Sequence, residues 1–140
     1  NVVNGQATVY NDKIIITKDN ITYDTLKKYH ADTIGGVMHS YSGSKEMAKE
    51  FIKLNFILGI SGPVTFKNGK VMKEVVEEIP MEYLITETDS PYLTPHPYRG
   101  KENGPKYIPL IIDEISLIKG ITKEKIEKQI EENVKKMFGV

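Results

Sequence analysis

The sequence predicts an α/β fold in which parallel strands alternate with helices. Four short apolar runs rich in β-branched residues recur along the chain, and each is followed by a stretch with helical spacing. The runs are apolar throughout rather than alternating, which is typical of strands buried on both faces of a parallel sheet. Their start-to-start spacing of roughly 20–27 residues fits compact strand–helix units with right-handed crossovers. At 140 residues, with no linker-like stretch, we expect one domain.

The strands are expected at residues 14–17, 34–39, 56–60 and 83–88. Ahead of the first, residues 7–10 and 13–17 flank Asn11-Asp12, a two-residue turn that can close a hairpin. Helical faces are expected at Leu26 and Tyr29, then at Met47, Ala48, Phe51 and Ile52, then at Val71, Val75 and Val76. A long irregular loop, residues 90–105, precedes two amphipathic helices; the first ends at Gly120 and the second has Thr122 as its N-cap.

Composition excludes several classes of protein. Nineteen Lys and Arg balance nineteen Asp and Glu, which excludes a protein that wraps nucleic acid through net charge. No apolar run reaches the roughly 18–20 residues that a membrane span requires, and the first residues show no signal peptide. The chain has no cysteine, which excludes disulfides and thiolate metal sites and favours a cytoplasmic setting. Any bound metal must have nitrogen and oxygen ligands.

The polar residues that follow the strands are the candidates for chemistry, because active sites of α/β sheets lie just beyond the strand carboxyl ends. His39 ends the second apolar run and precedes a small polar loop, residues 40–44. A neutral imidazole there can bind a metal or contact a phosphate. The alternative is a histidine that only forms hydrogen bonds within a turn.

Two carboxylates two residues apart, Glu87 and Asp89, close the fourth strand. Strand alternation points them to the same side, unless the strand has already ended. Such a pair can hold a hard cation or act as general base toward water. The alternative is that Asp89 caps a turn at Pro91.

Two loops complete the set of candidates. Residues 95–101 contain two prolines that preset the backbone, and Arg99 there can form a forked contact with a phosphate. Residues 61–69 form a turn of small residues that a ligand can approach closely. The alternatives are a solvated loop with incidental cations and a simple connection.

The order and flanks of these segments resemble the TatD family of metal-dependent hydrolases. The similar segments are residues 36–44, 59–68, 84–93, 95–101 and 132–139. The resemblance runs from about residue 13 to residue 140 and leaves residues 1–12 unassigned. It implies part of a (β/α)₈ TIM barrel, strands five to eight with their helices, and a nuclease that acts on DNA with divalent cations at the barrel mouth.

The resemblance also implies roles for individual residues. His39 matches the metal-binding histidine that ends the sixth strand. Asp89 matches the aspartate after the eighth strand, which binds metal and helps to activate the attacking water. Arg99 is placed for substrate phosphate, and Ser42 and Gly62 line the intervening loops as further substrate-binding residues.

The chain departs from the family pattern in its metal ligands. The family has a His-x-His pair on the first strand and a bridging glutamate on the fourth, and this sequence contains neither because it starts at the fifth strand. The histidine expected at the end of the fifth strand is replaced by Thr17, and the other histidines are His30 and His96. We therefore expect His39 and Asp89 to hold Mg²⁺, Mn²⁺ or Zn²⁺ weakly.

These features predict a metal-dependent phosphodiester hydrolase acting on DNA that is incomplete as an isolated chain. One alternative is a catalytically inactive TatD-like module. Another is a half-barrel that assembles with a complementary chain or a second copy and binds phosphate or nucleic acid. Four strand–helix units leave two sheet edges and the barrel interior uncovered, and such edges favour pairing.

Overall fold

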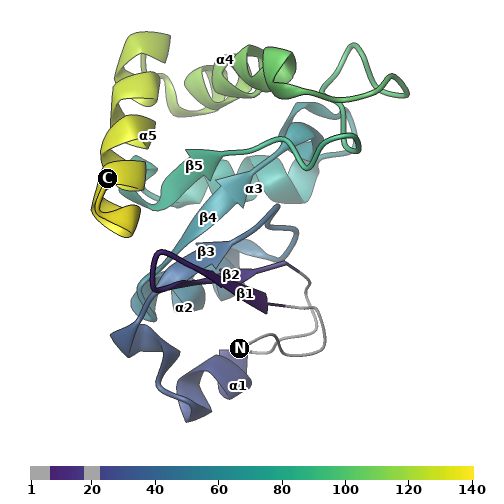
Figure 1. Ribbon diagram of the computed structural model, residues 1–140. Coiled ribbons are helices and arrows are strands. Elements are labelled where there is room, and N and C mark those ends of the chain that lie inside the picture. The colour runs from purple at the N-terminus through teal and green to yellow at the C-terminus, as the bar shows by residue number, and fades with distance from the viewer. Residues whose placement is uncertain (1–6, 18–22) are drawn as a thin grey trace.

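The computed structural model describes residues 7–17 and 23–140, which form a five-stranded sheet with helices packed on both faces (Figure 1). The strands follow one another in the order of the chain: β1 (Ala7–Tyr10), β2 (Lys13–Ile16), β3 (Gly36–Met38), β4 (Phe56–Ile60) and β5 (Leu84–Thr86). β2 to β5 are parallel, and β1 pairs with β2 as an antiparallel hairpin. The predicted parallel sheet and the hairpin are both confirmed.

Helices follow the strands as the spacing predicts. They are α1 (Tyr23–Lys28), α2 (Lys45–Lys53), α3 (Lys70–Glu78), α4 (Ile108–Lys119) and α5 (Lys123–Phe138), with short 3₁₀ helices η1 (Ala31–Thr33), η2 (Gly62–Thr65), η3 (Met81–Tyr83) and η4 (Pro105–Tyr107). Gly120, with φ of 65°, ends α4. The Thr122 side chain caps α5 by accepting a hydrogen bond from the amide of Lys125. Both predicted helix ends are confirmed.

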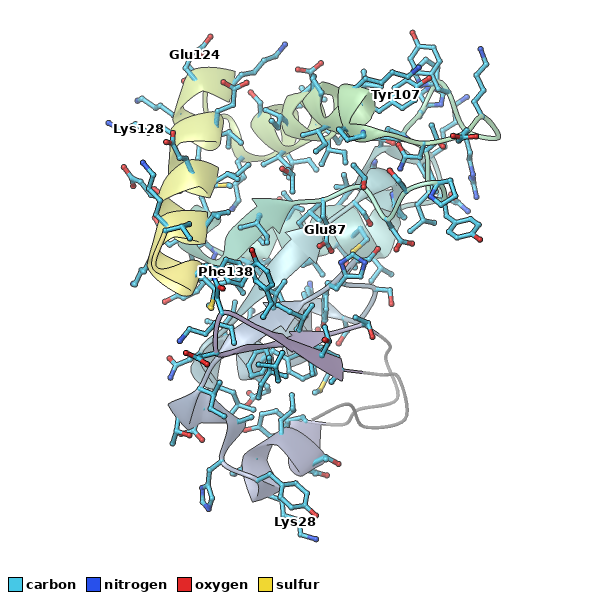
Figure 2. All side chains as sticks on the ribbon, viewed as in Figure 1. Lys28, Glu87, Tyr107, Glu124, Lys128 and Phe138 are labelled. Carbon is cyan, nitrogen blue, oxygen red and sulfur yellow. The ribbon has the colours of Figure 1, made fainter. Side chains whose placement is uncertain are left out.

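Alternate strand residues enter two separate apolar layers. Ile16, Met38 and Leu58 face the larger core, which α1 to α4 and the first half of α5 cover. On the opposite face Val37, Ile57 and Ile85 form a second cluster with Ile130, Val134, Met137 and Phe138 of α5. Phe138 lies against the sheet, whereas Glu124 and Lys128 project away from it (Figure 2). Burial on both faces explains why these strands are continuously apolar.

The buried Asn133 fixes α5 in place. Its amide nitrogen donates to the carbonyl oxygens of Met81 and Leu84, each at 2.8 Å. Met81 begins η3 and Leu84 begins β5, so α5 crosses the amino ends of the strands. The opposite, carboxyl edge of the sheet carries the long loop between β5 and η4 (Figure 1).

Several predicted details are wrong. The runs at 34–39 and 83–88 are strands only over 36–38 and 84–86, because Gly35 has a φ of 73° and Tyr83 ends η3. Tyr29 lies beyond the end of α1 and is exposed. Val71 was expected on the buried face of α3 but is exposed. Met72 lies on that face instead, together with Val75 and Val76. We expected the outer edge of β2 to be one of two open sheet edges, but β1 pairs with it.

Among the helices of the described residues, none combines the length and apolarity that a bilayer crossing needs.

Candidate metal and phosphate site

His39 stands at the carboxyl edge of the sheet, on the face opposite α2 and α3. It follows β3 directly, and its amide donates to the carbonyl of Ile16 at 2.8 Å. The register pairs Ile16 with Met38, so the next pair along the two strands is Thr17 and His39. Because Val37 faces the second apolar cluster, alternation turns His39 to the same side.

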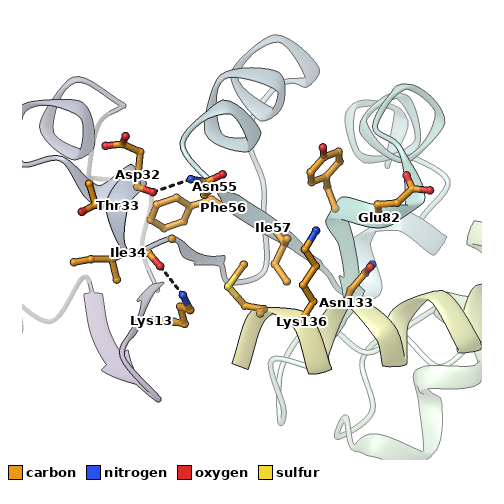
Figure 3. A pocket seen from close by; sticks show the side chains of 13 residues that line it. Lys13, Asp32, Thr33, Ile34, Asn55, Phe56, Ile57, Glu82, Asn133 and Lys136 are labelled. Carbon is orange, nitrogen blue, oxygen red and sulfur yellow. Dashed lines mark hydrogen bonds between the residues drawn. The ribbon is translucent and has the colours of Figure 1, made fainter. Parts of the chain in front are cut away.

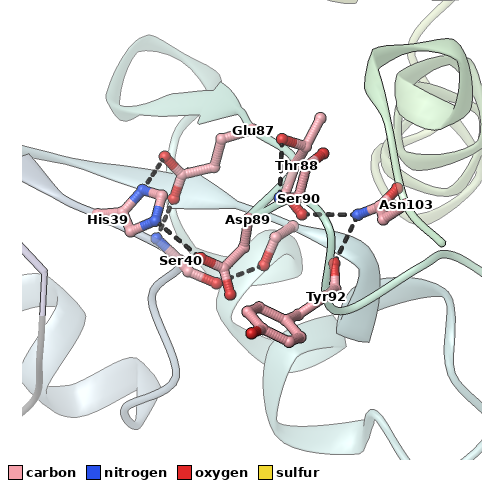
Figure 4. Close-up of polar contacts among 9 residues, drawn as sticks. His39, Ser40, Glu87, Thr88, Asp89, Ser90, Tyr92 and Asn103 are labelled. Atoms are coloured by element: carbon pink, nitrogen blue, oxygen red, sulfur yellow. Dashed lines mark hydrogen bonds and ion pairs between the residues drawn. The ribbon is translucent and has the colours of Figure 1, made fainter.

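The imidazole of His39 lies between two carboxylates (Figure 4). Nδ1 is 2.7 Å from Glu87 Oε2, and Nε2 is 3.1 Å from Asp89 Oδ1. The three side chains are 29%, 16% and 36% exposed, in the order His39, Glu87 and Asp89. The hydrogen bond that the imidazole donates to Glu87 raises the pKa of His39 to about 9; partial burial opposes this rise and Asp89 adds to it. Without a metal, this histidine is protonated at neutral pH.

Gly59 provides the space that Glu87 occupies. Glu87 follows the end of β5, and its amide donates to the carbonyl of Ile60 at 3.0 Å. Its carboxylate also accepts a hydrogen bond from the amide of Ser40. A Cβ atom on Gly59 would lie 2.1 Å from Glu87 Oε1, so a side chain there would displace the carboxylate. The sequence offered a signal, since a glycine inside an apolar strand marks a close approach.

Asp89 reaches His39 through a turn and not through strand alternation. β5 ends at Thr86, and Asp89 has a φ of 56°. The amide of Tyr92 donates to the Asp89 carbonyl at 2.9 Å, which closes the turn. The described contact of the Asp89 side chain is with His39, so the structure brings together the two residues predicted to bind metal.

The pair fits part of a metal site. Two ligands that each lie about 2.1 Å from one Zn²⁺ are about 3.0–3.4 Å apart at octahedral or tetrahedral angles, and Nε2 and Oδ1 are 3.1 Å apart. Glu87, on the other ring nitrogen, is the kind of partner that orients a metal-binding histidine. Within residues 7–17 and 23–140, no group of three or more His, Cys, Asp or Glu side chains has a geometry that could hold a metal ion.

Of the other residues considered as ligands, Thr17 lies next to His39, whereas His30 and His96 lie elsewhere. Thr17 follows β2 beside His39 and is exposed. His30 precedes η1, at the amino end of β3 and far along the strand from His39. His96 lies in the loop after β5, where its amide donates to Thr65 Oγ1 at 2.8 Å.

The predicted substrate-binding residues occupy the same edge of the sheet. The Arg99 guanidinium carbon lies 4.0 Å from the centre of the Phe66 ring. Gly62 begins η2, where a Cβ atom would lie 1.8 Å from the carbonyl oxygen of Leu93, so this glycine lets the loop pack closely. Ser42 is exposed in the loop between β3 and α2. Contact of these residues with substrate stays a prediction.

Asn103, which was not among the predicted site residues, joins the two ends of the loop. Asn103 is buried, and its amide nitrogen donates to the carbonyls of Thr88 at 2.8 Å and Tyr92 at 2.7 Å. Its own side-chain oxygen accepts from the amide of Gly104. No local pattern marks an asparagine in a polar loop as buried.

A separate hollow of about 300 Å³ lies at the amino ends of the strands (Figure 3). Lys13 Nζ donates to the carbonyl of Ile34 and Asn55 Nδ2 to that of Asp32, each at 2.8 Å. These contacts connect the starts of neighbouring strands. The hollow is at the opposite end of the strands from His39.

Comparisons with known proteins identify the family of the chain. The family model described as "TatD related DNase" matches residues 17–139. The chain is 47% identical to the "Uncharacterized metal-dependent hydrolase YabD" of Bacillus subtilis over 137 residues, which cover 96% of this chain and 54% of that protein. It is 31% identical over 133 residues to the Escherichia coli K12 protein YcfH, described in the same words, with 93% and 50% covered. The chain thus spans about half the length of the curated relatives it matches.

Solved structures show the same fold. The E. coli TatD homologue YJJV has a TM-score of 0.77 at 24% identity, covering 84% of this chain and 45% of its own. A TatD family hydrolase from Entamoeba histolytica has a TM-score of 0.71 at 21% identity, covering 81% and 45%. The prediction that the chain forms part of a TIM barrel is confirmed.

Proposed function

The chain belongs to the TatD family of metal-dependent hydrolases, and from this premise we propose that the carboxyl edge of its sheet supplies part of a divalent-metal site that hydrolyses DNA phosphodiesters. The observation that carries the proposal is the contact of His39 with Glu87 on one ring nitrogen and Asp89 on the other. An imidazole and a carboxylate that converge at ligand spacing suit a divalent cation.

Each residue of the site has its own role in this proposal. His39 Nε2 and Asp89 are the ligands, and Glu87 holds the imidazole in place through Nδ1. A bound divalent cation would supply positive charge to the phosphate and lower the pKa of water. Asp89 also accepts the proton of the attacking water, and Arg99 neutralises charge on the phosphate.

The residues that the structure describes do not bring together enough ligands for catalysis. His39 and Asp89 are the two that the family resemblance assigns here, and Thr17 occupies the position of a further histidine. We place the remaining ligands on residues outside this sequence, in the same or another polypeptide. Thr17 also favours a second candidate function, a module that binds phosphate or nucleic acid without hydrolysis.

Two versions of the protein test the proposal with an end-labelled single-stranded oligonucleotide and Mg²⁺ or Mn²⁺. The chain alone should cleave no faster than buffer. The same chain fused behind the amino-terminal half of the Bacillus subtilis relative should cleave, and Asp89→Ala in this chimera should lower the rate by about a thousandfold or more. A chimera that folds and binds metal but leaves the oligonucleotide intact would refute the phosphodiesterase and favour the binding module.

A further inference from the structure

A hollow of about 300 Å³ lies beside the His39 site, between η2 and the loop that follows β5. We call it the loop groove. Its lining residues are Phe66, Pro91, Tyr92, Leu93, Thr94, Arg99, Gly100 and Lys101. The groove begins two residues after Asp89, and its volume is at the lower end of the range for small-molecule sites, about 300–1,000 Å³.

One wall of the groove is positively charged. The Arg99 guanidinium lies over Phe66 with its central carbon 4.0 Å from the ring centre, and this cation–π contact holds the side chain at the wall of the groove. Lys101 Nζ lies 5.6 Å from the ring centre of Tyr98. The lining residues include no carboxylate. Two cations without a lining carboxylate favour an anion, and the planar Arg99 fork matches a phosphate.

The rim of the groove carries an exposed aromatic ring. Tyr92 is 70% exposed, although its backbone is fixed at both polar atoms. Its amide donates to the Asp89 carbonyl, and its carbonyl accepts from Asn103. A ring held in place beside cations is the arrangement that binds unpaired bases by stacking.

The loop is held in shape by its own hydrogen bonds. Asn103 joins its ends, Thr94 Oγ1 donates to the carbonyl of Lys101, and the His96 amide donates to Thr65. Thr94 is buried. A groove formed before binding costs less ordering entropy when a ligand enters.

We propose that the loop groove binds one nucleotide of a single-stranded nucleic acid, with its phosphate on Arg99 and Lys101 and its base stacked on Tyr92. The turn from Tyr92 to Asp89 then places the neighbouring phosphate toward the His39 site. The choice of a nucleic acid rests on the proposed function, but the binding itself requires no metal and no hydrolysis.

Fluorescence anisotropy of a labelled six-residue oligothymidylate, measured with the whole chain in EDTA, tests this groove. Arg99→Gln should weaken binding about tenfold or more, because it removes a charged, forked hydrogen-bond donor. Tyr92→Ala should weaken binding about fivefold or more, whereas Tyr92→Phe, which keeps the ring, should stay within about twofold. Lys106→Gln removes a nearby exposed charge outside the groove and is the matched control.

Competition experiments distinguish a nucleotide from a free phosphate. Inorganic phosphate should displace the oligonucleotide from the wild-type chain, and Tyr92→Ala should leave the affinity for phosphate itself unchanged. The proposal would be overturned if the Arg99→Gln variant bound the oligonucleotide with wild-type affinity. Wild-type oligonucleotide affinity in Tyr92→Ala would also overturn it, by reducing the groove to a phosphate site. EDTA prevents metal-dependent cleavage, so failure here is separate from failure of the cleavage assay.

Discussion

At the scale of the residue, the site depends on the missing side chain of Gly59. The carboxylate of Glu87 occupies the space above this glycine and contacts His39 and the amide of Ser40. His39 and Asp89 could be singled out as candidates because each lies at the end of an apolar run, and the family resemblance assigned them to the metal. The part played by Glu87 depends on the register of β3, β4 and β5, which no local pattern contains.

Gly59→Ala should destabilise the chain by about 1–3 kcal/mol, because the new methyl group forces Glu87 off two hydrogen-bond partners. The measurement is urea unfolding of Gly59→Ala, Glu87→Ala and the double variant. In the Glu87→Ala background, Gly59→Ala should lower the free energy of unfolding much less than in the wild type. An equal loss of unfolding free energy in both backgrounds would show that the methyl group does not act through Glu87.

At the scale of the element, the loop after β5 and the α2–α3 pair illustrate different limits of prediction. The helices could be predicted from the spacing of their apolar residues. Gly120 and Thr122 marked the end of α4 and the start of α5. The loop could be predicted as irregular but not as ordered, because its order comes from side-chain hydrogen bonds with the backbone, above all those of the buried Asn103. Ion pairs between helices likewise depend on packing that the sequence does not display.

Asn103→Ala should lower the free energy of unfolding by about 1–3 kcal/mol, since two carbonyls lose their donor. Hydrogen exchange of loop amides should accelerate as the loop ends separate. Asn103→Asp keeps the acceptor for Gly104 but cannot donate, and it should be no more stable than Asn103→Ala. Asn68→Ala, at an exposed site, is the control, and an equal loss there would contradict this role.

The α2–α3 contact should depend on pH through Glu78. Hydrogen bonds from Lys45 and Lys49 lower the pKa of Glu78 from 4.5 to about 2, so the carboxylate stabilises the fold above pH 4.5 and loses this effect as the pH falls through 2. The stability difference between the wild type and Glu78→Gln should therefore be present at pH 7 and absent below pH 2. Glu77→Gln, at an exposed neighbour, is the matched control. A stability difference between the wild type and Glu78→Gln that does not change with pH would contradict the assignment.

At the scale of the whole molecule, the sheet keeps two edges but is better covered than the sequence suggested. β1 pairs with the outer edge of β2, and α5 covers the second face of the sheet. Coverage by α5 could not be predicted, because an amphipathic helix does not specify which face of a sheet it covers. β1 itself remains an edge strand, with Val9 52% and Tyr10 61% exposed.

We expect self-association that increases with concentration, because an exposed apolar edge strand is a template for pairing. Sedimentation velocity over a wide concentration range measures it. Val9→Lys should shift the chain toward monomer, whereas Leu117→Lys, at an exposed site on α4, should not. A compact wild-type monomer at every concentration would contradict this prediction.

The central claim is that His39 and Asp89 bind one divalent cation together. Calorimetric titration of the 140-residue chain with Mn²⁺ tests it most directly, with His39→Ala and Asp89→Ala as variants. Asp113→Ala, which removes an α4 carboxylate paired with Lys123, is the control. We predict binding in the millimolar range, lost in both site variants and kept in the control, since two ligands hold a cation weakly. Binding that persists unchanged when either His39 or Asp89 is replaced would contradict the account.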